Sequence, residues 1–184
     1  NALATALTSL ISNEDLVRAL KQYEPEFLNQ FRNIMASKIG LEEYQPEDEQ
    51  LINQLLEIMQ TNNVDYTIFF RQLADYSADN PSIRDQFIDR ESFDTWAKKY
   101  SQRLQQQSSS EQQRHQQMQS VNPKYVLRNY MAQAAIDAAQ QGDYTEVNLL
   151  LEVLQAPFAE HPQAEKYAGL PPDWAEQISV SCSS

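Results

Sequence analysis

Glycine is scarce in this chain, where Gly40, Gly142 and Gly169 are the only three among 184 residues. Proteins built of β-strands need glycine at many tight turns, because other residues avoid the backbone conformations found there. Loops that cradle phosphate need several glycines at fixed spacing, as in G-x-G-x-x-G or G-x-x-x-x-G-K. Three widely separated glycines fit neither pattern. The abundant leucine, alanine, glutamine and glutamate favour helices instead.

Signals for the beginning and end of helices recur along the first hundred residues. Ser12 or Asn13 can cap one helix. Pro25 is expected at the first position of the next, which Gly40 terminates. Further helices are expected from Pro46, after the cap Asp65, from Asn80-Pro81 and from Glu91. The sequence therefore predicts an all-α fold, an irregular array of about eight to ten mostly short helices.

Residues 105–121 differ in composition from the rest of the chain, because glutamine and serine dominate them and Met118 is their only apolar side chain before residue 121. Such a stretch buries too little apolar surface to hold a fixed structure. We weigh a flexible connection against a solvated helix extension and expect the flexible connection. The chain then divides into a helical subregion at 3–104, this connection, and a second helical subregion at 122–184. Whether the two subregions share one core stays open.

The most apolar helix is expected at 123–141, with Asn122 as its cap, Pro123 as its first residue and Gly142 after its last turn. Its apolar residues cover almost the whole circumference. A helix of this kind belongs in the interior of a protein.

Two cations would lie in the first two turns of that helix, where the helix dipole disfavours positive charge. They are Lys124 and Arg128. The long Arg128 side chain could extend past its apolar neighbours to solvent. Alternatively, a carboxylate in this chain or in a partner could hold it. The sequence leaves both possibilities open.

The chain is strongly acidic, with 14 lysines and arginines against 26 aspartates and glutamates and a net charge of −12. Such a surface repels phosphate backbones, so we expect no nucleic-acid partner. The sequence has neither a run of about 18 apolar residues nor the start of a secretory leader, so we expect no membrane partner. A single cysteine suits a reducing compartment. We therefore expect a cytoplasmic protein.

Side chains able to catalyse a reaction or to hold a metal form no recognisable group. His115 and His161 lack partners at metal-ligand spacing, and we interpret both as solvated surface residues. The acids of E-E-Y-Q-P-E-D-E at 42–49 are explained by their place at the beginning of a helix. We predict no catalytic, cofactor-binding or metal-binding residue in this segment.

Several strings are nevertheless specific. They are N-P-K-Y-V-L-R-N-Y-M-A-Q-A-A-I at 122–136, G-D-Y-T-E-V at 142–147, L-E-V-L-Q-A-P-F at 151–158, Y-A-G-L-P-P-D-W-A at 167–175 and the terminal S-C-S-S. In these strings the chain resembles the C-terminal region of the selenoprotein O family, also called YdiU. On this resemblance the family-motif residues are Asn122, Pro123, Lys124, Arg128, Asn129 and Trp174.

The resemblance implies a fold, an activity and partners. Members of this family have a protein-kinase-like fold and transfer AMP from ATP to hydroxyl groups of proteins, with a divalent metal such as Mg or Mn. The chain would be the C-terminal helical part of such an adenylyltransferase. The family's nucleotide and metal residues precede this part, so the segment alone should be inactive. Its expected partners are the missing N-terminal catalytic part and protein substrates.

Cys182 is the only cysteine and lies in the last three residues, where little can bury it. The family has selenocysteine or cysteine at this position, so the resemblance implies a redox role. Our hypothesis is a reversible disulfide with a cysteine of the catalytic part or of another protein. One alternative is an exposed thiol without a role. Another is a stand-alone helical interaction module with a redox-active C-terminal cysteine.

Overall fold

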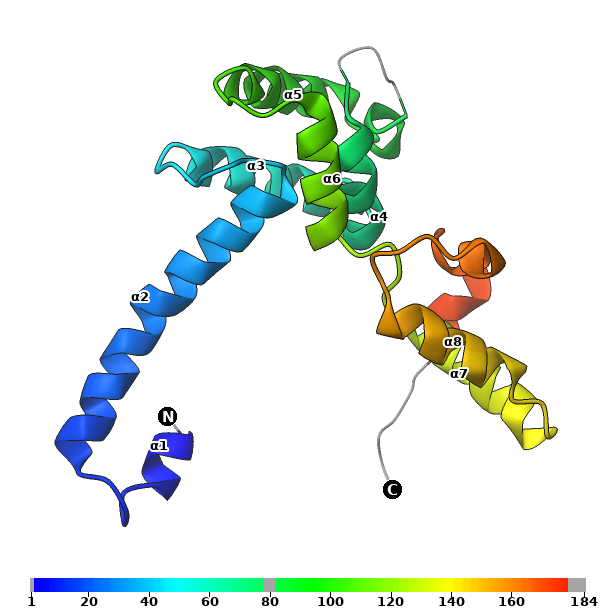
Figure 1. Cartoon of the computed structure of the whole chain (residues 1–184), viewed down its shortest axis with the longest axis horizontal. Coiled ribbons are helices and arrows are strands. Elements are labelled where there is room, and N and C mark those ends of the chain that lie inside the picture. Colours follow the sequence, from blue (N-terminus) through cyan, green and yellow to red (C-terminus); the bar gives the residue numbers. More distant parts are fainter. Residues whose placement is uncertain (1, 78–81, 179–184) are drawn as a thin grey trace.

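The computed structural model describes residues 2–77 and 82–178, and these contain helices and no strand (Figure 1). The all-α prediction is confirmed. The α-helices are α1 (Ala2–Ala6), α2 (Asn13–Lys38), α3 (Asp48–Thr61), α4 (Tyr66–Gln72), α5 (Arg90–Leu104), α6 (Glu111–Val121), α7 (Asn129–Gln140) and α8 (Thr145–Gln155). Four 3-10 helices join them: η1 (Leu73–Asp75), η2 (Arg84–Gln86), η3 (Pro162–Tyr167) and η4 (Asp173–Gln177). Over these described residues, no helix is both long and apolar enough to cross a membrane.

Helix α2 is a single helix of 26 residues, so the prediction of a new helix at Pro25 is wrong. Ser12 caps it by accepting a hydrogen bond from the Asp15 N–H. Pro25 lies in its interior, where a proline removes one backbone hydrogen bond and usually bends or breaks the helix. The apolar spacing from Val17 to Met35 is continuous across the proline, and the helix continues with it.

Gly40 ends α2 as the sequence predicts, with a φ of 74°. The Leu41 N–H donates to the Ala36 carbonyl at 2.9 Å, and the Gly40 N–H donates to the Ser37 carbonyl at 3.0 Å. This pair of bonds satisfies carbonyls at the helix end that would otherwise lack donors.

The other expected helix beginnings have mixed outcomes. Asp65 caps α4 as predicted, accepting a hydrogen bond from the Ile68 N–H at 3.0 Å. Helix α3 begins at Asp48, two residues after Pro46. Asn80-Pro81 lies outside the described residues.

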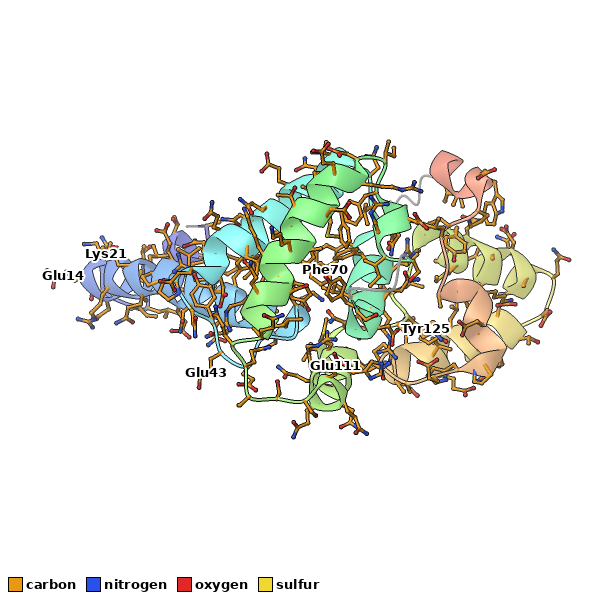
Figure 2. The ribbon with its side chains drawn as sticks, turned by 90° about the horizontal axis from the view of Figure 1, so that it is seen from above. Glu14, Lys21, Glu43, Phe70, Glu111 and Tyr125 are labelled. Atoms are coloured by element: carbon orange, nitrogen blue, oxygen red, sulfur yellow. The ribbon has the colours of Figure 1, made fainter. Side chains whose placement is uncertain are left out.

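The first hydrophobic core, here called the N-terminal cluster, lies among α3, α4, α5, α6 and the end of α2. In Figure 2 the labelled Phe70 lies among these helices. Two aromatic side chains of α5 also donate to backbone carbonyls, Trp96 to Leu51 at 3.0 Å and Tyr100 to Ile39 at 2.7 Å. The cluster comprises Met35, Ala36, Ile39, Leu41, Leu51, Ile52, Leu55, Met59, Phe69, Phe70, Leu73, Ala74, Ile83, Phe87, Phe93, Trp96, Ala97, Tyr100 and Met118.

Helix α6 occupies most of the stretch predicted as a flexible connection, so that prediction does not hold for residues 111–121. Ser110 and Gln113 form a reciprocal capping box at its beginning. Met118 is fully buried, and Arg114 is 7% exposed with its guanidinium donating to the Tyr76 carbonyl at 3.1 Å. Composition did not indicate the burial of α6, because the aliphatic part of an arginine and its hydrogen bonds can take the place of apolar side chains.

The second core, the C-terminal cluster, lies between α7, α8 and η3, with Tyr125 at its edge. In Figure 1 α7 and α8 run side by side at the end of the molecule away from α2. Gly142 ends α7 as predicted, with a φ of 83°. The cluster comprises Tyr125, Tyr130, Met131, Ala135, Leu150, Val153, Ala164 and Tyr167.

The packing of α6 on the end of α2 can be tested at Gly40. A Cβ there would lie 2.6 Å from Met118 Sδ and 2.8 Å from Arg114 Cγ, whereas one at Gly142 meets nothing within 4 Å. We expect Gly142→Ala to cost about 1 kcal/mol for its backbone conformation alone. Gly40→Ala should cost at least ~2 kcal/mol, because α6 must also shift. Urea unfolding of both variants measures the difference, and equal losses would show that α6 is not packed on Gly40.

Candidate functional site at the junction of the two clusters

The segment 122–128, which carries most of the family-motif residues, is an irregular loop rather than a helix. The prediction of a helix at 123–141 capped by Asn122 is therefore wrong for its first turns, and α7 begins at Asn129. The N–H groups of Lys124 and Tyr125 both donate to the Pro157 carbonyl, at 2.9 and 3.2 Å. These tertiary bonds replace the first turn that Pro123 would have begun.

Asn122 joins the ends of α6 and α2 and does not cap a following helix. Its N–H donates to the Met118 carbonyl at 2.9 Å, which closes α6. Its side-chain Nδ2 donates to the Lys38 carbonyl at 2.8 Å, at the last residue of α2. The Asn122 side chain is fully buried, and its Oδ1 has no hydrogen-bond partner within the described parts of the chain.

Arg71, in the last turn of α4, holds the junction from the side of the N-terminal cluster. Its Nη1 donates to the carbonyls of Gln119 and Asn122, at 2.9 and 3.2 Å. Its Nη2 donates to Glu160 Oε1 at 2.8 Å. The Arg71 side chain is only 11% exposed, whereas that of Glu160 is 62% exposed, so this ion pair lies at the edge of the junction.

Lys124 completes a small ionic network with the segment after α8. Its Nζ lies 2.5 Å from Glu160 Oε2 and 2.7 Å from Glu165 Oε2. Burial by itself would lower the pKa of Lys124, but the hydrogen bonds to Glu160 and Glu165 outweigh it and hold the pKa above its usual value. Glu160 therefore bridges Lys124 to Arg71, and through it to α4.

Arg128 makes a two-pronged ion pair with Asp65, the residue that caps α4. The Nη1–Oδ2 and Nη2–Oδ1 distances are 2.6 and 3.0 Å. The two side chains are 20% and 17% exposed, so the pair is largely desolvated. Of the alternatives that the sequence left open, the structure shows the pairing with a carboxylate of the same chain.

The remaining predicted site residues lie apart from this ionic network. Asn129 is exposed at the beginning of α7, and Trp174 packs edge-on against Tyr130 with a ring separation of 5.9 Å. Cys182 lies outside the described residues.

The interpretation of both histidines as solvated surface residues is wrong for His161. His161 is 9% exposed, and its Nε2 lies 3.0 Å from the Ala156 carbonyl oxygen. His115 is partly exposed and lies 2.9 Å from Asp75. The sequence placed His161 before a proline and gave no signal of the turn that buries it.

The charges of the junction are matched, which limits its chemistry. Arg71, Lys124 and Arg128 each contact a carboxylate, so none is left to neutralise phosphate. The cavity beside Arg71 and Lys124 measures ≈ 240 Å³ and is also lined by Glu160 and Glu165, whose charge opposes phosphate. In the described residues no three or more His, Cys, Asp or Glu side chains are grouped to hold a metal. The charged contacts of the junction therefore hold helices of the two clusters together.

The sequence did not reveal the partners Asp65, Arg71 and Glu160. Asp65 was recognised only as a cap, and nothing in the local pattern around Arg71 or Glu160 indicates a contact 89 residues apart in the chain. Such pairs become visible only when the two clusters are placed together.

The strength of the Arg128–Asp65 pair can be measured by a double-mutant cycle with Arg128→Met and Asp65→Asn. Asparagine retains the helix cap, so the cycle isolates the charge. We expect a coupling free energy of about 1–3 kcal/mol. Arg84 and Asp94 form a similar two-pronged pair at 2.6 and 2.7 Å, but with side chains 40% and 49% exposed. Their coupling should stay below ~1 kcal/mol, and equal couplings would show that burial adds nothing at Arg128.

The same pair predicts a dependence of stability on pH. Burial by itself would raise the pKa of Asp65, but hydrogen bonds from Arg128 and from the backbone outweigh it and hold the pKa below its usual value. Stability from such a group is present above its unfolded pKa of about 3.9 and is lost as pH falls through the lower folded pKa. The difference in unfolding free energy between the parent and Asp65→Asn should therefore be constant above about pH 5 and shrink below about pH 4. Urea unfolding from pH 6 to pH 3 tests this, and a difference that persists to pH 3 would contradict it.

Comparison with known proteins identifies the family of the chain. A family model described as "Protein adenylyltransferase SelO" matches residues 1–155. Among curated relatives, the protein nucleotidyltransferase YdiU of Herminiimonas arsenicoxydans is 46% identical over 188 residues, covering 100% of this chain and 38% of the relative. The YdiU proteins of Pseudomonas aeruginosa (strain LESB58) and Myxococcus xanthus (strain DK1622) are 43% and 46% identical. These two alignments cover 100% and 99% of this chain, and each covers 38% of the relative.

The chain thus spans 38% of the length of the curated relatives that it matches. The family model covers α1 to α8, and the alignment with the curated relative also covers Glu160 and Glu165 of the junction. This extent, together with identities above 40% along the chain, decides its family. The chain belongs to the SelO family of protein adenylyltransferases.

Proposed function

We propose that this chain is the C-terminal helical part of a protein adenylyltransferase with a kinase-like fold. The longer protein would transfer AMP from ATP to serine, threonine or tyrosine hydroxyl groups of other proteins, using Mg or Mn. The observation that carries the proposal is the family match over residues 1–155, together with relatives named as protein nucleotidyltransferases. The predicted cytoplasmic location belongs to the same proposal.

The role of this part would be to support the catalytic part rather than to react. This proposal is supported by the cations at the junction, which are engaged by carboxylates of the same chain. We therefore assign no step of AMP transfer to its described side chains. Nucleotide, metal and the reacting hydroxyl group would be held by the remainder of the longer polypeptide, which is the principal partner proposed here.

A second candidate function is a stand-alone helical module that binds another protein. The exposed apolar side chains of α2 favour it, because such side chains are available to a partner. The length of the natural gene product separates the two proposals. A gene encoding only these 184 residues would favour the module.

The proposed activity is tested with ATP labelled in either its α- or its γ-phosphate. We expect the longer protein, with Mg or Mn, to transfer the α-label to protein and to leave the γ-label in solution, since AMP retains only the α-phosphate. The 184-residue segment alone should transfer neither label. Transfer of the γ-label would indicate a kinase, and α-label transfer by the segment alone would overturn the supporting role.

A further inference from the structure

Helix α2 carries an apolar stripe that nothing covers in the described parts of the chain. The stripe, here called the α2 face, consists of Val17, Leu20, Tyr23, Phe27, Phe31 and Ile34. Its members recur every three or four residues, so they lie on one side of the helix. Their exposure ranges from 40% at Leu20 and Phe31 to 67% at Tyr23. Large contiguous apolar surfaces of this kind mark interfaces.

The α2 face continues into the core of the molecule. Met35 lies four residues after Phe31 on the same side of the helix and is 2% exposed, as part of the N-terminal cluster. The aromatic rings along the exposed part stack in series, with separations of 6.0 Å for Tyr23–Phe27 and 6.3 Å for Phe27–Phe31. Figures 1 and 2 show α2 projecting from the body, with α1 at its far end. The stripe is therefore packed at the Met35 end and exposed to solvent toward Val17.

We propose that the α2 face docks, within one polypeptide, on the part of the protein that the relatives have beyond this chain. Alignment covers 100% of this chain, so α2 belongs to the shared part of the family. The same alignment covers 38% of the relative, so most of the relative's length has no counterpart here and is available as the occupant. The occupant presents apolar side chains to the stripe, and the resulting interface extends the N-terminal cluster.

A second copy of this chain is the less suitable occupant. Helix α2 has 26 residues and is about 39 Å long. With a width of about 10 Å, one side of it offers on the order of 400 Å². Stable interfaces between separate chains bury roughly 800 Å² on each partner. A segment of the same polypeptide needs less area, because its tether has already removed most of the entropy lost on association.

The net charge of the chain also argues against a second copy as the occupant. Each copy of the chain has a net charge of −12, so two copies repel one another as they approach. The inference rests on the proposed function only in taking the chain to be part of a longer polypeptide, and it requires no AMP transfer.

The occupant can be identified by photo-crosslinking in the longer protein. A benzophenone analogue of phenylalanine replaces Phe27 on the α2 face, and in a control variant it replaces Asn29, which is exposed two residues further on. Two residues turn a helix by about 200°, so the control lies on the opposite side. We expect position 27 to crosslink to residues of the same polypeptide outside these 184, without a dimer band, and position 29 to give little product.

Other results have definite meanings. A dimer band from position 27 would assign the face to a second copy and overturn the proposal. The absence of any crosslink at position 27 would overturn it as well. The readout is a mass-spectrometric peptide map, so a longer protein that crosslinks but transfers no AMP would refute the proposed function and retain this inference.

A matched pair of charge variants provides a second measurement in the longer protein. Phe27→Glu and Asn29→Glu add the same charge to neighbouring positions of α2. We expect Phe27→Glu to lower the melting temperature by at least ~2 °C, because a covered apolar face must then bury a carboxylate. Asn29→Glu should change it by less than about 1 °C, as exposed substitutions usually do. Equal melting temperatures would show that the face is uncovered in the longer protein and would overturn the proposal.

Discussion

The contacts made from the two ends of α4 hold the C-terminal cluster on the N-terminal cluster. Asp65, before the helix, pairs with Arg128, and Arg71, in its last turn, donates to the carbonyls of Gln119 and Asn122. Arg71 also reaches Glu160, which in turn holds Lys124. A helix of seven residues therefore fixes the loop 122–128 at both ends. The Arg128–Asp65 pair is largely removed from water on both sides, so its bonds are stronger than they would be on the surface.

The charged groups of the junction hold helices together. Its cations Arg71, Lys124 and Arg128 are each paired with an aspartate or glutamate of the same chain. The motif that carries the family resemblance thus has a structural reason to be specific. Asn122, Lys124 and Arg128 each require a particular partner in space, so their spacing has to match the geometry of both clusters.

The two ends of α2 differ in how completely they are packed. Around Met35 and Gly40, α2 and α6 approach so closely that a Cβ at position 40 would overlap Met118. Toward Val17, the same helix presents its apolar side chains to solvent. The exposed end of α2 is the face for which we propose an occupant in the longer polypeptide.

The sequence by itself determined the helical class, a helix start at Ser12 or Asn13, the cap at Asp65 and the helix ends at Gly40 and Gly142. These features depend on backbone conformation and on hydrogen bonds within a few residues, so local patterns reveal them. Only the tertiary structure decided the non-helical conformation of residues 122–128, the burial of α6 and the partner of Arg128. In each case a distant carbonyl or carboxylate outweighed the local preference, because a desolvated polar group must find a partner wherever the fold supplies one.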